Sequence, residues 1–218
     1  MTIYGKMPIY LGRHDFNLPE VMYYLYLPVM MHGEGRHGPE DIRLPNNVAC
    51  TLPIIRVAMW HATGARGYPY KYAYLSARKG VATPGNALNR PGWHCDGFGT
   101  DDLNYVWWTG PGTRFAIQPF EGIVSDHNRS LTQFDEQVRP ENVVTYPEKG
   151  LYQIAPDVVH ATPEITETCW RQYVKISLSD HRYNLENNSY NYLFQYDWPL
   201  HSREIARNSP TATQRDYP

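Results

Sequence analysis

Alternating apolar and polar positions dominate the chain from about residue 71 onwards. In YKYAYLSAR, which begins at Tyr70, tyrosine, serine and arginine share one face of an extended chain, and alanine and leucine share the other. RQYVKISLS, which begins at Arg171, alternates in the same way, with Val174, Ile176 and Leu178 on its apolar face. Three further stretches also read as strands: NYVWWTGPGTRFAIQPF as a pair around its TGPG turn, then ENVVTYP and GLYQIAP. Many short strands divided by Gly, Pro and Asp predict a β-sandwich or barrel.

The first 69 residues carry a different pattern. Residues 17–33, NLPEVMYYLYLPVMMHG, predict a short helix that begins near Asn17 or Pro19 and is disturbed by Pro28. Residues 49–64, ACTLPIIRVAMWHATG, predict a strand. We therefore expect one domain over 1–218. It comprises an extension of helix, loop and strand over 1–69 that packs on the core, a catalytic core over 70–180, and a tail over 181–218.

Composition narrows the function classes. The chain has 18 Tyr and 6 Trp, and its formal net charge is -2, which predicts no clear nucleic-acid surface. No apolar run approaches the roughly 20 residues of a membrane span, so no membrane association is expected. Cys50, Cys95 and Cys169 are odd in number and widely spaced, which argues against a disulfide framework and favours the cytoplasm.

The segment PGWHCDGFGTDD, which begins at Pro91, carries the strongest candidate chemistry. On an extended chain His94 and Asp96 point to one side and Cys95 points to the other. His160, which follows the strand-like run in GLYQIAPDVVH, is the best candidate for a third ligand. Two imidazoles and one carboxylate leave other coordination positions open, which suits non-haem Fe(II).

Arg171 follows His160 by eleven positions and belongs to the polar face of its strand, together with Tyr173 and Lys175. An arginine that projects into a barrel is unfavourable unless an anion meets it. A dicarboxylate cosubstrate would supply that anion, held by a bidentate guanidinium–carboxylate pair.

Taken together, His94-x-Asp96, the distant His160 and Arg171 resemble the Fe(II)- and 2-oxoglutarate-dependent dioxygenases, over roughly residues 70–180. The resemblance implies a mainly β chain with a few flanking helices, folded as a double-stranded β-helix, also called a jelly roll or cupin fold. It implies that His94, Asp96 and His160 bind the iron and that Arg171 binds the far carboxylate of 2-oxoglutarate. Many members carry Ser or Thr two residues after the arginine, where this chain has Tyr173.

The resemblance also implies the cosubstrates and the reaction. 2-Oxoglutarate and O₂ would be consumed, succinate and CO₂ released, and a C–H bond of a small molecule, amino acid, peptide side chain or nucleotide hydroxylated. Tyr72, Tyr74 and Asn104 are candidates for contacts to the near end of 2-oxoglutarate, with Arg78 and Lys175 as replacement anchors for its far end. Loop chemistry marks TGPG near Gly110 and residues 33–38 as candidate pocket lids.

Other interpretations of the same residues stay open. His94 and Asp96 could be a hydrogen-bonded pair in a glycine-rich loop, and Arg171 could stack on an aromatic ring at the surface. The chain could also be a cupin-type metalloenzyme that does not use 2-oxoglutarate, or a jelly-roll binding module without enzymatic activity.

Overall fold

Two antiparallel sheets form the framework of the protein in a computed structural model, which describes residues 3–32, 41–63, 69–97, 100–124 and 126–203. The larger sheet has six strands in the order β1-β7-β4-β9-β3-β2, and the smaller has three in the order β6-β5-β8. The larger sheet contains β1 (Ile9–Arg13), β2 (Met22–Met31), β3 (Tyr72–Ala82), β4 (Leu103–Thr109), β7 (Gly150–Ile154) and β9 (Cys169–Ser179). The smaller contains β5 (Arg114–Ala116), β6 (Val143–Thr145) and β8 (His160–Ala161).

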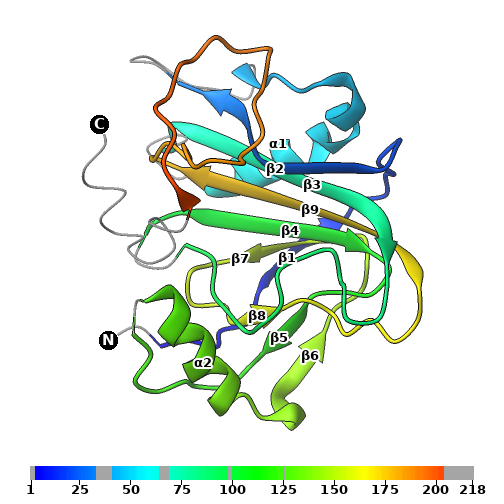
Figure 1. The fold of residues 1–218 in the computed structure, drawn as a ribbon, viewed down its shortest axis with the longest axis vertical. Coiled ribbons are helices and arrows are strands. Elements are labelled where there is room, and N and C mark those ends of the chain that lie inside the picture. The colour runs from blue at the N-terminus through cyan, green and yellow to red at the C-terminus, as the bar shows by residue number, and fades with distance from the viewer. Residues whose placement is uncertain (1–2, 33–40, 64–68, 98–99, 125, 204–218) are drawn as a thin grey trace.

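The helices lie beside the two sheets (Figure 1). Helix α1 (Leu52–Ala62), preceded by the 3-10 helix η2 (Asn46–Thr51), lies by the larger sheet, and α2 (His127–Gln137) lies by the smaller one. A second 3-10 helix, η3 (Pro140–Asn142), leads into β6. The protein is therefore mainly β with few helices, as the sequence predicted. No helix in the described parts of the chain combines the length and the apolar character that a membrane span needs.

The two faces of the larger sheet differ as the alternation in β3 and β9 predicted. Val174, Ile176 and Leu178 of β9 belong to the main apolar core, and Ile55 and Met59 of α1 pack into the same core. The opposite face of β9 carries Arg171, Tyr173 and Lys175, which all line a cavity. Burying one face of the sheet under α1 leaves the polar face free to form a site.

Between the sheets, a second apolar cluster fixes their separation. Val106 and Trp108 of β4 and Tyr152 of β7 pack with Phe115 of β5 and with Val158, just before β8. Strands β4 and β5, which flank the TGPG turn, thus lie in different sheets and do not form a hairpin.

Two sequence-based predictions of helix and strand were wrong. Residues 17–33 contain strand β2 rather than a helix, and Pro28 is tolerated because β2 is the edge strand of its sheet. Residues 49–64 contain η2 and α1 rather than a strand. Helix α2 begins at His127, where the Asp126 side chain caps it by accepting hydrogen bonds from the backbone N–H groups of Asn128 and Arg129.

The segments on either side of residues 70–180 join the same framework. The N-terminal segment supplies β1, which pairs with β7, and β2, which pairs with β3. After β9, the Asn191 side chain donates hydrogen bonds to the carbonyl groups of Pro28 and Arg43. The candidate lid at residues 33–38 lies outside the described residues.

Candidate metal centre

His94 and His160 lie directly opposite each other across a two-residue antiparallel bridge. Each backbone N–H donates to the carbonyl oxygen of the other residue at 2.9 Å. His160 is the first residue of β8, so His94 lies at the edge of the smaller sheet. Because opposed residues project their side chains to the same face, the two rings come within 4.5 Å, measured between centroids.

Asp96 reaches the same point from two residues beyond His94. Its carboxylate oxygen Oδ2 lies 3.6 Å from Nε2 of His160. Cys95, which lies between His94 and Asp96 in the sequence, is buried in an apolar cluster with Trp93 and Phe134. The alternation expected for this segment is therefore present, and Cys95 is not part of the group.

Hydrogen bonds fix which nitrogen of each imidazole can bind a metal. Nδ1 of His94 lies 2.9 Å from the carbonyl oxygen of Gly92, and Nδ1 of His160 lies 3.0 Å from that of Val158. A carbonyl oxygen only accepts, so each Nδ1 carries the proton and donates it, and each Nε2 keeps its lone pair. Backbone acceptors of this kind orient metal-binding histidines in proteins.

The resulting group of His94, Asp96 and His160 could hold a metal ion. One ligand atom from each residue lies within 4.8 Å of the others. Ligand atoms ~2.1 Å from a shared ion lie at most ~4.2 Å apart, so small side-chain rotations complete the coordination. Burial and the neighbouring His160 lower the pKa of His94 to about 3, which keeps this imidazole neutral and able to coordinate at neutral pH.

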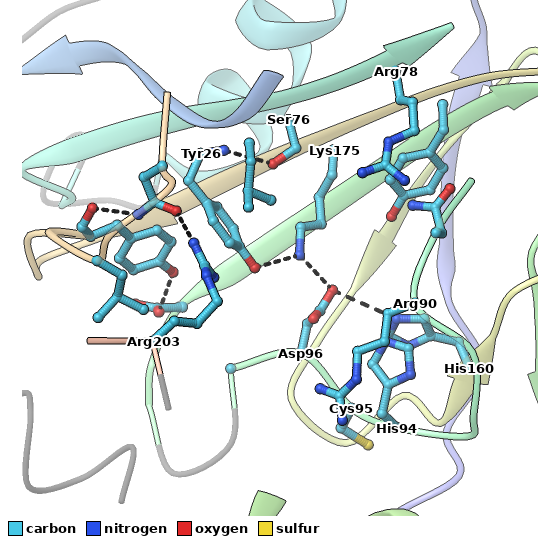
Figure 2. Close-up of a pocket in the computed structure, with 18 of the residues that line it drawn as sticks. Tyr26, Ser76, Arg78, Arg90, His94, Cys95, Asp96, His160, Lys175 and Arg203 are labelled. Atoms are coloured by element: carbon cyan, nitrogen blue, oxygen red, sulfur yellow. Dashed lines mark hydrogen bonds and ion pairs between the residues drawn. The ribbon is translucent and has the colours of Figure 1, made fainter. Parts of the chain in front are cut away.

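Lys175 of β9 supports the carboxylate. Its ammonium donates to Oδ2 of Asp96 at 2.9 Å and to the hydroxyl of Tyr26 at 3.0 Å, as Figure 2 shows. Burial alone would raise the pKa of Asp96, but the positive charge of Lys175, followed by the contact with His160, opposes it, and the net effect holds this pKa well below its usual value. Burial likewise disfavours the charged ammonium, yet Asp96 and Tyr26 raise the pKa of Lys175 above its usual value. Asp96 is therefore ionised and held in place.

Tyr26 reaches this position through an unusual backbone. Its φ of 49° lies in the left-handed region, at an irregularity in the pairing of β2 with β3 between Tyr24 and Leu27. Its backbone N–H donates to the hydroxyl of Ser76 at 3.0 Å, and its ring meets Tyr183 edge to face. The bulge turns a residue of an edge strand towards the metal ligands.

A cavity of about 440 Å³ opens beside the metal ligands. Several of its lining residues come from the larger sheet, and others from the loop before Asp96 and from the segment after β9. Its tyrosines are Tyr23, Tyr26, Tyr173 and Tyr183. Its cationic residues are Arg78, Arg90, Arg171, Lys175, Arg182 and Arg203, against the carboxylates Asp96 and Asp102. The composition of this lining favours an anionic ligand.

The remaining predicted site residues divide into two pairs. Arg171 and Tyr173 line the cavity, with the Arg171 guanidinium 5.3 Å from the centre of the Tyr173 ring. Tyr74 and Asn104 do not line it. The Tyr74 hydroxyl donates to the carbonyl of His181, and the Asn104 side chain accepts from the hydroxyl of Ser177. Tyr74 and Asn104 therefore form hydrogen bonds within the protein and do not contribute to the cavity lining.

Sequence reasoning missed Tyr26, Tyr23 and Tyr183 as cavity residues. The signal for Tyr183 was weak, because it lies in the segment interpreted as a polar tail. Tyr26 lay in the segment interpreted as a helix, and its direction depends on one bulge.

Comparisons with known proteins were made by family, by sequence and by structure. No protein-family model and no curated protein matches the chain. Among solved structures, the crystal structure of EvdO2 from Micromonospora carbonacea var. aurantiaca is 15% identical to this chain, with a TM-score of 0.31. The match covers 49% of this chain and 52% of EvdO2, about half of each.

Proposed function

We propose that the protein is a non-haem Fe(II)- and 2-oxoglutarate-dependent dioxygenase built on a double-stranded β-helix. The observation that carries this proposal is the convergence of two imidazoles and one carboxylate at the wall of a cavity. The two facing antiparallel sheets, with the ligands at the edge of the smaller one, support the proposed fold.

The donor set supports iron as the metal. Two neutral nitrogens and one anionic oxygen on one side of an ion leave the opposite positions to exogenous ligands, as Fe(II) oxygenases require. A structural zinc site is commonly closed by four protein ligands and commonly includes cysteine thiolates. Here Cys95 packs in an apolar cluster and is not one of the three grouped ligands, and burial raises the pKa of its thiol.

In this proposal the side chains of the protein would position the iron, the cosubstrate and the substrate, and the iron would supply the oxidative chemistry. His94, Asp96 and His160 would hold the iron, which together with 2-oxoglutarate and O₂ would supply the oxidising power for C–H hydroxylation and yield succinate and CO₂. Lys175 keeps Oδ2 of Asp96 engaged, which orients the carboxylate. The carbonyl groups of Gly92 and Val158 orient the imidazoles.

The cavity supports a substrate of modest size. A volume of about 440 Å³ accommodates a small molecule or one side chain together with a five-carbon cosubstrate. The tyrosine rings supply flat apolar walls, and the arginines supply charge.

An anaerobic titration tests the proposal. Purified protein is mixed with Fe(II) and then with 2-oxoglutarate, and the visible spectrum is searched for the weak charge-transfer band of the chelated cosubstrate. We expect the band in the wild-type protein and its loss in Asp96→Ala. Absence of the band from wild type, or its survival in Asp96→Ala, would contradict the proposal.

One observation favours a second candidate, a metalloenzyme with the same ligands that does not use 2-oxoglutarate. The Arg171 guanidinium is expected to bind a dicarboxylate. It already donates hydrogen bonds to two backbone carbonyls and one side-chain amide oxygen of the protein. Incubation with O₂ separates the candidates, because only the first releases succinate from 2-oxoglutarate.

A further inference from the structure

Arg171 is committed to the protein through three hydrogen bonds. Nε donates to the carbonyl of Pro111 at 2.9 Å, and Nη1 donates to the carbonyl of Ala87 at 2.9 Å and to Oδ1 of Asn89 at 2.5 Å. Either parallel pair of N–H groups that would clamp a carboxylate needs Nε or Nη1. Arg171 is also 1% exposed, and burial lowers its pKa to about 10. The guanidinium therefore connects the loop of residues 87–89 to the loop that contains Pro111. Only its Nη2 group is left to donate to a ligand.

Arg78 presents the opposite situation. It lines the same cavity, and its guanidinium lies over the ring of Tyr23, 4.0 Å from the ring centre. No hydrogen bond or ion pair joins the Arg78 side chain to any residue in the described ranges. All five N–H groups thus remain available, and burial lowers the pKa of Arg78 from its usual value. An arginine that faces a cavity with no acceptor from the protein is suited to receive an anion from a ligand.

The strand register places Arg78 within reach of a ligand that is bound at the metal. Ser76 of β3 pairs with Lys175, whose ammonium contacts the metal-ligand carboxylate. Arg78 is two residues further along the same face, a step of ~7 Å, and pairs with Tyr173. Figure 2 shows Arg78 extending from its strand into the space that His94, Asp96 and His160 border.

We propose that Arg78, and not Arg171, is the carboxylate anchor of this cavity and binds the far end of 2-oxoglutarate through its unoccupied guanidinium fork, while Arg171 is a structural residue. This inference rests on the proposed function. The Tyr23 ring covers one face of the Arg78 guanidinium, and the N–H groups lie in the guanidinium plane, where the ring does not cover them.

Two oxo acids of equal length test the assignment. 2-Oxoglutarate carries the far carboxylate, and 2-oxopentanoate carries a methyl group in its place. Each is titrated anaerobically into the Fe(II)-loaded wild-type protein and into Arg78→Gln, Arg78→Lys, Arg171→Gln and Lys79→Gln, with the charge-transfer band as the readout. Lys79→Gln is the matched control, because it removes the same charge from the neighbouring position, where the side chain bonds to Asn17 and Leu18.

We expect Arg78→Gln to weaken 2-oxoglutarate binding on the order of tenfold or more and to leave 2-oxopentanoate binding unchanged. Arg78→Lys should recover part of the loss, and Lys79→Gln should bind both acids as wild type does. Arg171→Gln should lower the thermal midpoint and affect both acids equally.

Wild-type affinity for 2-oxoglutarate in Arg78→Gln would overturn the assignment, as would a loss confined to 2-oxoglutarate in Arg171→Gln or an equal loss of both acids in Arg78→Gln. These results leave the proposed function standing, because the band forms in wild type. If no band forms in wild type with either acid, the proposed function fails and the assignment fails with it.

Discussion

The ammonium of Lys175 lies 2.9 Å from Oδ2 of Asp96, although the two residues are 79 positions apart in the chain. Both side chains are largely buried, with 9% and 19% of their surface exposed. In the metal-free protein this ion pair compensates the carboxylate charge that a bound cation would otherwise neutralise. We therefore expect the stability of the fold to depend on whether a cation occupies the candidate site.

Lys175→Met should destabilise the metal-free protein more than the metal-bound protein. Removing one partner of a buried ion pair leaves the other charge uncompensated, which costs about 3 kcal/mol. A divalent cation on Asp96 replaces the lost positive charge, so Co²⁺ should shrink the deficit. Urea denaturation of wild type and variant, each with and without Co²⁺, measures both differences, and an equal deficit in the two conditions would refute the link.

Strand β9 was predictable because its two faces meet different environments. Its apolar residues pack on the α1 side of the sheet and its polar residues line the cavity. Apolar and polar residues therefore alternate along the sequence of this strand. The grouping of His94 with Asp96 was predictable for a related reason. The two-residue spacing of His94 and Asp96 already places both on one side of an extended segment.

Helix α1 was misread because adjacent Ile54 and Ile55 resemble a strand. Its buried positions, Ile54, Ile55, Ala58 and Met59, follow the spacing of a helix face, and Pro53 falls in the first turn, where its missing N–H is harmless. Strand β2 was misread because its bulges break the alternation that identifies strands.

Other parts of the site could not be read from sequence. The contact of Lys175 with Asp96 depends on how β9 lies across from the 94–96 segment. The engagement of Arg171 likewise depends on backbone carbonyls of two loops, which carry no side-chain signature.

Substitutions in α1 should follow helical burial. Met59 is 1% exposed and its neighbour Trp60 is 79% exposed. Met59→Ala should lower the free energy of unfolding by about 3 kcal/mol, because it leaves a cavity in the core. Trp60→Ala should change it by less than about 0.5 kcal/mol. Denaturant titrations of both variants check this, and comparable losses would contradict the helical register.

The ionisation of the Asp102 carboxyl group should lower the free energy of unfolding as pH rises. Asp102 is 3% exposed and accepts a hydrogen bond from the Tyr183 hydroxyl at 2.6 Å, and burial raises its pKa above its ordinary value. Between the unfolded pKa and the higher folded pKa, the folded protein binds the proton more tightly. Its contribution to stability is therefore fully present at low pH and is lost as pH rises through the folded pKa.

Comparison with Asp102→Asn, which cannot ionise, isolates this effect. The free energy of unfolding of wild type minus that of the variant should fall as pH rises from the ordinary aspartate pKa of about 4 through the higher folded pKa. Denaturation curves at several pH values measure it. If the difference instead grows with pH, the folded protein stabilises the Asp102 carboxylate as an anion, and the predicted direction of the pH dependence is wrong.

Equilibrium metal binding tests the central claim most directly. Co²⁺ is titrated into the wild-type protein, the single alanine variants of His94, Asp96 and His160, and the control His61→Ala, whose imidazole contacts Tyr105 instead. We predict one ion per chain in wild type and in His61→Ala, with affinity reduced on the order of 100-fold or more in each of the three ligand variants. A wild-type protein that binds no ion, or ligand variants that bind it as tightly as wild type, would contradict the assignment of a metal centre to these three residues.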